Sequence, residues 1–253
     1  VLITFGDVTL TGTSTDGGGV SVEISNNDDE FSAGLMEVHV GDITMDSSDS
    51  ASLLIADNDG ETDRFDTPIV PVVGVQIDIG DVNIDLSSGS ITDSVTATLL
   101  TVENDGAHIV MGDVNVSMGN SDGGSYGYFC DGIVGHDESV IVRGDTTVTI
   151  GSSDESAGYA VSYIQGNSNS EITLGDYSVT VGANASDGDV GSGALSFGVS
   201  VNADSEITMG AVTLDGFGGD ALGCDSAVFF ITDNVLSTVT ISDVEVSSGV
   251  SVV

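Results

Sequence analysis

Hydrophobic and polar residues alternate along eight short segments of the chain, and these segments share one pattern. Each has an alternating stretch, a Gly-Asp step and a second alternating stretch. They read ITFGDVTL (3–10), VHVGDITM (38–45), IDIGDVNI (77–84), IVMGDVNV (109–116), IVRGDTTV (141–148), ITLGDYSV (172–179), ITMGAVTL (207–214) and VTISDVEV (239–246). A period of two is typical of β-strands with one buried and one wet face.

The glycine of each copy sets the register of the repeat. It is found at Gly6, Gly41, Gly80, Gly112, Gly144, Gly175 and Gly210, and Ser242 takes the eighth position. The residue before it is apolar in seven of eight copies, and the residues two and four after it are mostly apolar as well. We therefore predict that these positions face the core in every copy.

A third strand follows in most copies, as in GVSVEISNND (19–28) and ATLLTVEND (97–105). The polar turns after it carry Asn27, Asn58, Asn104, Asn169 and Asn202. Asparagine tolerates a left-handed backbone, and stacked asparagines can form a hydrogen-bonded ladder, so we expect both features in these turns.

The interval between repeats predicts the fold. The repeat glycines and Ser242 are 35, 39, 32, 32, 31, 35 and 32 residues apart. About 32 residues with three short strands suit one coil of a parallel β-helix, so we predict a single all-β solenoid domain over 1–253, with about eight coils. Segment 57–74, with both prolines, is expected to be a loop insertion. The alternative is an antiparallel hairpin repeat, as a propeller or sandwich, because Gly-Asp also favours two-residue hairpins.

The charge of the chain restricts its partners. There are 41 acidic residues against two basic ones, Arg64 and Arg143, and the net charge is −39. Such a surface repels nucleic acid and anionic membranes, so we exclude nucleic-acid binding. No apolar run approaches the ~20 residues of a membrane helix, so membrane insertion is not expected. The absence of lysine and the abundance of Thr, Ser, Gly and Asn favour an extracellular or cell-surface location.

Segment VIVRGDTTVTIGSSDESAGYAVSYIQGNSNSEITLGDYSVTVG (140–182) resembles the parallel β-helix passenger regions of autotransporters and filamentous-haemagglutinin-type adhesins. It shares with them an alternating strand, a Gly-Asp step, a small-residue stretch and another alternating strand. The resemblance implies a right-handed β-helix exported from a bacterium-like cell. This chain departs from those regions in its acidity, its ~32-residue unit and the lack of a membrane-barrel segment.

The candidate catalytic groups are few. His39 and His108 lie two coils apart at different offsets from their glycines, and with His136 we expect them to face solvent. No GxxxxGK[ST] or HExxH motif is present. Pairs of carboxylates suited to a glycosidase occur everywhere on such a surface, so they carry no information. We therefore predict that the chain is not an enzyme and has no catalytic or cofactor-binding residues.

Three uncommon residues raise specific questions. Arg143 occupies a core-facing slot, and we favour a local register slip over a buried arginine paired with an acid, because a lone buried charge is costly. Cys130 and Cys224 lie three coils apart, so we expect no disulfide between them and predict that they are small buried side chains.

Calcium is the cation that the acidic sequence favours. The residue after the repeat glycine is Asp7, Asp42, Asp81, Asp113, Asp145, Asp176 and Asp243, with Ala211 the exception. We expect these aspartates to form a column, in which most cap their own turns. Segment 57–63 (DNDGETD) fails as an EF-hand loop, but its acids could hold Ca²⁺, and the candidate ligands are Asp57, Asp59, Glu61 and Asp63.

These features predict a non-catalytic extracellular structural protein: a surface filament, sheath or adhesin stalk. The sequence starts inside a repeat strand and ends in alternating apolar residues. We expect end-to-end pairing of subunits, or else a segment of a longer solenoid. The partner is thus the chain itself, in a head-to-tail homopolymer, with surface glycans as a further candidate. The alternative function is a secreted β-helix that binds or degrades polysaccharides. Tyr126, Tyr128, Tyr159 and Tyr163 are expected on alternating strand faces, which does not favour that alternative.

Overall fold

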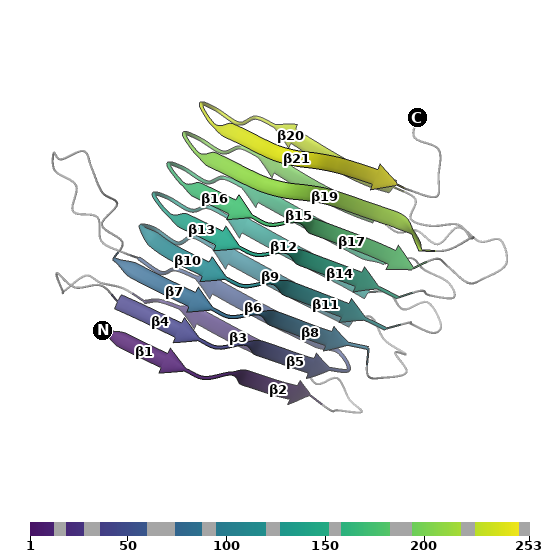
Figure 1. The fold of residues 1–253 in the computed structure, drawn as a ribbon, viewed down its shortest axis with the longest axis horizontal. Helices are drawn as coiled ribbons and strands as arrows, with labels where there is room; N and C mark the ends of the chain where they lie inside the picture. Colours follow the sequence, from purple (N-terminus) through teal and green to yellow (C-terminus); the bar gives the residue numbers. More distant parts are fainter. Residues whose placement is uncertain are drawn as a thin grey trace.

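A computed structural model gives the fold of residues 1–12, 19–27, 36–59, 74–87, 95–119, 127–151, 158–182, 194–218 and 226–247. Every pair of neighbouring strands in these ranges is parallel, and the coils stack in sequence order from one end of the molecule to the other (Figure 1). The predicted all-β parallel solenoid is therefore confirmed, and the antiparallel alternative is wrong.

The front of the molecule is a 14-stranded sheet made of two columns of strands. The first column contains β1 (Leu2–Phe5), β4 (Met36–Val40), β7 (Val75–Ile79), β10 (Ala107–Met111), β13 (Val140–Arg143), β16 (Glu171–Leu174) and β19 (Glu206–Gly218). The second contains β2 (Val8–Gly12), β5 (Ile43–Ser47), β8 (Val82–Leu86), β11 (Val114–Met118), β14 (Thr146–Ile150) and β17 (Tyr177–Gly182), and meets the first through β19. The last strand, β21 (Thr238–Ser247), pairs with β19.

The back of the molecule is a seven-stranded sheet formed by the predicted third strands. They are β3 (Val20–Ser25), β6 (Ser50–Ala56), β9 (Val95–Val102), β12 (Gly127–Val134), β15 (Tyr159–Gln165), β18 (Ala194–Ser200) and β20 (Ser226–Thr232). The prediction of eight coils is slightly too high, because in the described ranges the eighth repeat segment contributes β21 alone.

The core lies between the two sheets and follows the predicted register. Residues before and after the repeat glycines, such as Val40, Ile43 and Met45, are buried on the front, and Leu53 and Ile55 face them from the back. Phe5 holds the same inward position in the first coil but is 56% exposed, because no described coil stacks below it.

Most of the predicted loop insertion, residues 60–73, lies outside the described residues. Asp57, Asn58 and Asp59 are part of the turn that recurs in other coils, since Asp59 bridges to Asp105 and Asp105 bridges to Asp137. Residues 57–59, which the sequence assigned to the insertion, therefore belong to the repeated turn. No helix in the described ranges is long and apolar enough to cross a membrane.

Candidate functional site

A ladder of buried side chains runs through the turns that connect the back sheet to the front sheet. Asn27 Nδ2 donates to Asn58 Oδ1 at 2.6 Å, and Asn58 Nδ2 donates to Asn104 Oδ1, also at 2.6 Å. The ladder continues with Asn167, Asn202 and Asn234, joined by bonds of 2.9 and 2.8 Å. The asparagine ladder is therefore confirmed, but Asn167 and not Asn169 belongs to it.

The left-handed backbone of these turns lies beside the ladder rather than on it. Asn26, Asp57 and Glu103 precede ladder residues and have φ values of 55°, 53° and 50°. Asn169, two residues after Asn167, has a φ of 48°. A second ladder follows, in which the backbone N–H of one serine donates to the hydroxyl of the next, through Ser139, Ser170, Ser205 and Ser237.

His136 takes the place of an asparagine in the ladder and is fully buried. Its Nδ1 accepts the backbone N–H of Asn104 at 3.2 Å, and its Nε2 donates to the Thr101 carbonyl at 2.9 Å. Burial lowers the pKa of His136 to about 4, although the hydrogen bonds to Thr101 and Asn104 oppose this shift. The expectation that His136 faces solvent is wrong, and the imidazole is a neutral structural group.

The repeat aspartates form the predicted column, but they bond between coils rather than within their own turns. The backbone N–H of Asp81 donates to Asp42 Oδ1 at 3.0 Å, and that of Asp113 donates to Asp81 Oδ1 at 2.9 Å. The same bond links the other aspartates from Asp7 to Asp176, and Ala211 N–H donates to Asp176. Only Asp243, among these described aspartates, accepts the N–H of its own neighbour, Val244, as local capping predicts.

These bonds explain why glycine precedes the aspartate. A Cβ added at Gly112 would lie 2.3 Å from Asp81 Oδ1 and 3.0 Å from the Asp81 nitrogen. The same close approach recurs at Gly41, Gly80, Gly144, Gly175 and Gly210, whereas nothing lies within 4 Å at Gly6. The Gly-Asp step is thus a contact between coils, since each carboxylate occupies the space that a side chain would need in the next coil.

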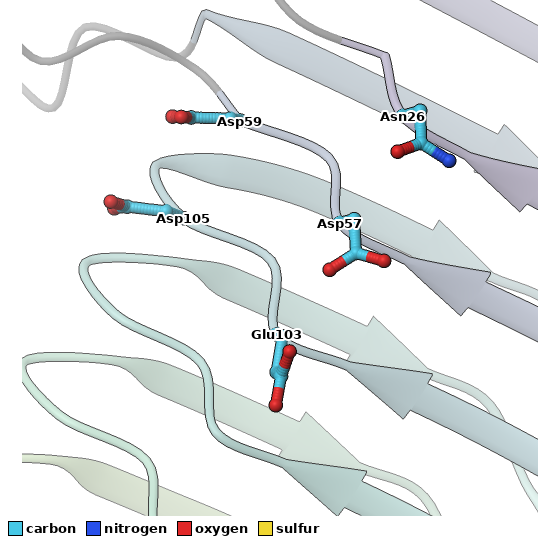
Figure 2. Close-up of a pocket in the computed structure, with 5 residues that line it drawn as sticks. All are labelled: Asn26, Asp57, Asp59, Glu103 and Asp105. Atoms are coloured by element: carbon cyan, nitrogen blue, oxygen red, sulfur yellow. The ribbon is translucent and has the colours of Figure 1, made fainter.

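Two of the four candidate calcium ligands lie beside acids from the following coil. Asp57 and Asp59 line a hollow of ≈ 340 Å³ together with Asn26, Glu103 and Asp105. Figure 2 shows Asp59 and Asp105 pointing the same way from successive turns, with Asp57 and Glu103 stacked nearby. Glu61 and Asp63 lie outside the described residues. Among the residues that the structure describes, no group of three or more His, Cys, Asp or Glu side chains could hold a metal ion.

Arg143 is buried in the core and paired with an acid from the back sheet. Its guanidinium donates to both carboxylate oxygens of Asp131, each at 2.8 Å. Burial would lower the pKa of Arg143, but the charge and hydrogen bonds of Asp131 outweigh it and raise that pKa. The predicted register slip is therefore wrong, because Arg143 keeps the inward position and Asp131 supplies the charge that the sequence did not reveal.

Tyr177 lies next to this ion pair in the core. Its hydroxyl is hydrogen-bonded to Ser162, and its ring meets Phe197 edge to face with 4.8 Å between ring centroids. Burial, and then the charge of Asp131, raise the pKa of Tyr177 well above its usual value. The phenol is therefore a neutral hydrogen-bonding group inside the solenoid.

The other two histidines lie on the front sheet. His39 is about one-third exposed, with Nδ1 2.9 Å from Asp78 and Nε2 3.5 Å from Glu37. Because both ring nitrogens face carboxylates, His39 is not arranged to activate a hydroxyl or thiol. His108 is half-buried and pairs in register with Gln76 and Val140.

The outer face of the back sheet is uncharged from β6 to β20, and we call this surface the back face. Its outward positions are Ser50, Ser52, Leu54, Ala56, Thr96, Thr98, Leu100, Val102, Tyr128, Cys130, Gly132, Val134, Tyr159, Val161, Tyr163, Gln165, Ala194, Ser196, Gly198, Ser200, Ser226, Val228, Phe230 and Thr232. The described tyrosines of the back sheet, Tyr128, Tyr159 and Tyr163, therefore share one face, contrary to the expectation. Tyr126 lies outside the described residues.

Cys130 is a free thiol on the back face, half-buried between Tyr128 and Tyr163. Partial burial raises the pKa of Cys130, and the hydrogen bond with Tyr163 opposes this shift. Partial burial likewise raises the pKa of Tyr128 and of Tyr163, and Cys130 adds to both shifts. Cys130 is thus not the buried core residue that the sequence indicated, and Cys224 lies outside the described residues.

Comparison of the chain with protein-family models, curated proteins and solved structures finds no match.

Proposed function

We propose that this protein is a non-catalytic extracellular structural protein: a surface filament, sheath or adhesin stalk built by end-to-end stacking of β-helical subunits. The observation that carries the proposal is that inward-facing side chains are exposed at both ends of the described stack. Phe5 at one end is 56% exposed, and Val244 and Val246 at the other are 40% and 38% exposed. Apolar side chains and strand edges left open in this way favour pairing with a further coil.

The extracellular location and the likeness to adhesin passenger regions belong to the same proposal. They are supported by the parallel solenoid, by the net charge of −39 and by the absence of lysine. Nucleic acid and membrane lipids are not among the proposed partners, because the charge of the chain repels both.

The test is whether the two ends stack. Purified protein is imaged by electron microscopy and sedimented at high concentration with calcium present. We expect rods whose lengths are multiples of one subunit, and shorter particles when Val244→Asp places a charge at the exposed end. The control is Thr147→Asp, which adds the same charge to the outer front face. Protein that stays monomeric under these conditions contradicts self-assembly.

Calcium is the ion proposed to stabilise the stack by reducing the repulsion among the acids at the hollow beside Asp57 and Asp59, where no three of the described side chains converge on one ion. Glu103 and Asp105 bring further carboxylates to the same hollow from the next coil. Calorimetric titration with CaCl₂ tests this directly. We expect Asp59→Asn to weaken the binding, and Asp215→Asn, which changes an acid on the front sheet, to leave it unchanged.

A polysaccharide-binding function is the alternative that one observation favours. Tyr128 and Tyr159 are register neighbours on the back face, and Tyr163 lies on the same face. Aromatic side chains on an uncharged surface suit a neutral glycan, whereas the acidic remainder of the molecule repels acidic glycans. Co-sedimentation with insoluble neutral polysaccharide, with and without Tyr159→Ala, tests this alternative.

A further inference from the structure

The outer surfaces of the two sheets differ in chemistry. Front strands alternate strictly, so that β11 presents Asn115 and Ser117 outward and β14 presents Thr147 and Thr149. Back strands carry apolar residues on the outer face as well as the inner one, and their outward side chains include Leu100 and Val161 among neutral Ser and Thr side chains. Apolar residues on both faces of a strand are typical of parallel sheets that are covered on both sides.

Aromatic rings on the back face lie over glycines. A Cβ added at Gly132 would lie 2.9 Å from two ring carbons of Tyr163, and one at Gly198 would lie 2.1 Å from the Phe230 ring. The rings therefore cover positions where a side chain would otherwise stand. This arrangement makes the back face nearly flat. A flat face suits the packing of one sheet against another at a separation of about 10 Å.

We propose that the back face is covered by the back face of a second copy of this chain, as a lateral dimer. Net charge is the reason for this choice of partner. At −39, contact through an acidic face would bring carboxylates together, whereas the outward positions from β6 to β20 hold no charged residue. Association through the back face keeps the acids of the two copies on their outer sides.

The area of the back face is sufficient for such a dimer. Six strands spaced ~4.8 Å apart, each about seven residues long, cover about 29 by 23 Å, so the pair buries about 1,300 Å² in total. Specific interfaces bury ~1,200–2,000 Å², which places this dimer at the lower end of the stable range.

The position of the acidic turns selects the orientation of the dimer. Asp57, Asp59, Glu103 and Asp105 lie in the turns at one edge of the back sheet (Figure 2). A two-fold axis parallel to the direction of stacking places the turns of the two copies at opposite edges of the interface. A two-fold axis along the strands would bring the turns together, and like charges in contact oppose association. The stacking direction, from the first coil to the last, is therefore the same in the two solenoids of the dimer.

The dimer is tested in a Val244→Asp background, in which end-to-end stacking is blocked. Sedimentation equilibrium is measured from 0.05 to 1 M NaCl. We expect a dimer whose dissociation constant falls as salt rises, because salt screens the repulsion between the copies. Val161→Glu at the centre of the back face should raise the dissociation constant at least 100-fold, since it buries an unpaired charge. The matched control, Thr147→Glu on the front face, should leave the dimer unchanged.

A second variant, Ser196→Glu, places a charge on the same part of the back face and replaces Val161→Glu in the test if that variant does not fold. Ser196 is the register neighbour of Val161 on β18 and has a small side chain. A chain that is monomeric at every salt concentration overturns the proposal, and so does a dimer that tolerates both glutamates. Monomers that bind neutral polysaccharide, with loss of binding in the glutamate variants, would also overturn it and assign the back face to a glycan.

The orientation is tested by pulsed electron paramagnetic resonance on a spin label at Asp137→Cys in a Cys130→Ser, Cys224→Ser chain. Asp137 lies in a turn near the middle of the stack. Parallel solenoids place the two labels on opposite edges, more than about 20 Å apart. A shorter distance overturns the parallel arrangement.

Discussion

Arg143 on β13 and Asp131 on β12 form a two-pronged ion pair across the core, with both N–O distances at 2.8 Å. The pair joins the front sheet to the back sheet inside one coil, and both side chains are 4% exposed. Each charge is buried and depends on the other, because neither can be solvated by water at this depth.

Removal of either partner should therefore destabilise the fold more than removal of both. We expect Arg143→Met or Asp131→Leu alone to lower the free energy of unfolding by about 3–5 kcal/mol. The double variant should recover most of the loss, because it leaves no unpaired charge. Urea denaturation of the four proteins measures this coupling. Equal and additive losses in the single variants would show that the pair is not coupled.

The buried His136 makes stability depend on pH. Its pKa is about 4 in the folded state and about 6.5 in the unfolded state, so the unfolded chain binds more protons between these values. Stability from this group is therefore complete above pH 6.5 and falls as pH drops toward 4, by about 3 kcal/mol in total.

The control for this pH dependence is His136→Asn, which restores the residue type found elsewhere in the ladder and cannot titrate. We expect the difference in unfolding free energy between this variant and the parent chain to grow as pH falls from 7 to 4. Changes in carboxylate protonation affect both proteins and cancel in the comparison. A difference that is constant with pH would contradict the burial of a neutral imidazole.

The Gly-Asp contact between coils predicts a position-dependent effect of one substitution. Gly112→Ala should destabilise the fold by about 1–3 kcal/mol, because its Cβ would overlap the Asp81 carboxylate. Gly6→Ala should have little effect, because nothing lies within 4 Å of the added carbon. Thermal denaturation of both variants compares the same chemical change with and without a neighbouring coil. Equal shifts in midpoint would exclude the contact as the reason for the repeat glycine.

The aspartate column predicts that cations stabilise the solenoid. Adjacent carboxylates at ~4.8 Å repel each other by about 0.9 kcal/mol in water, and less as salt rises. We expect the melting midpoint at low ionic strength to rise with NaCl or CaCl₂ and to fall with chelator if calcium is bound. Asp113→Asn keeps the acceptor oxygen for Asp145 but removes one charge, so its midpoint should depend less on salt. A melting midpoint that does not change with ionic strength would contradict repulsion between carboxylates of the aspartate column.

The sequence alone determined the strands, their register and their parallel stacking from coil to coil. These properties depend on a pattern of period two that is repeated at near-constant intervals. It also placed Asp7 to Asp176 in one column and predicted the asparagine ladder. A closer reading could have improved the ladder, since Asn167, Asn202 and Asn234 each have a serine three residues later (Ser170, Ser205 and Ser237), whereas Asn169 does not.

Only the tertiary structure decided which side chains meet between coils and across the core. The pairing of Arg143 with Asp131, the place of His136 in the ladder and the close contacts at the repeat glycines from Gly41 to Gly210 all depend on neighbours 12 to 38 residues away. One copy of the repeat does not reveal them. The back face was hidden for the same reason. Its uncharged outer surface exists only because six separate strands, each with a few neutral outward residues, are stacked side by side.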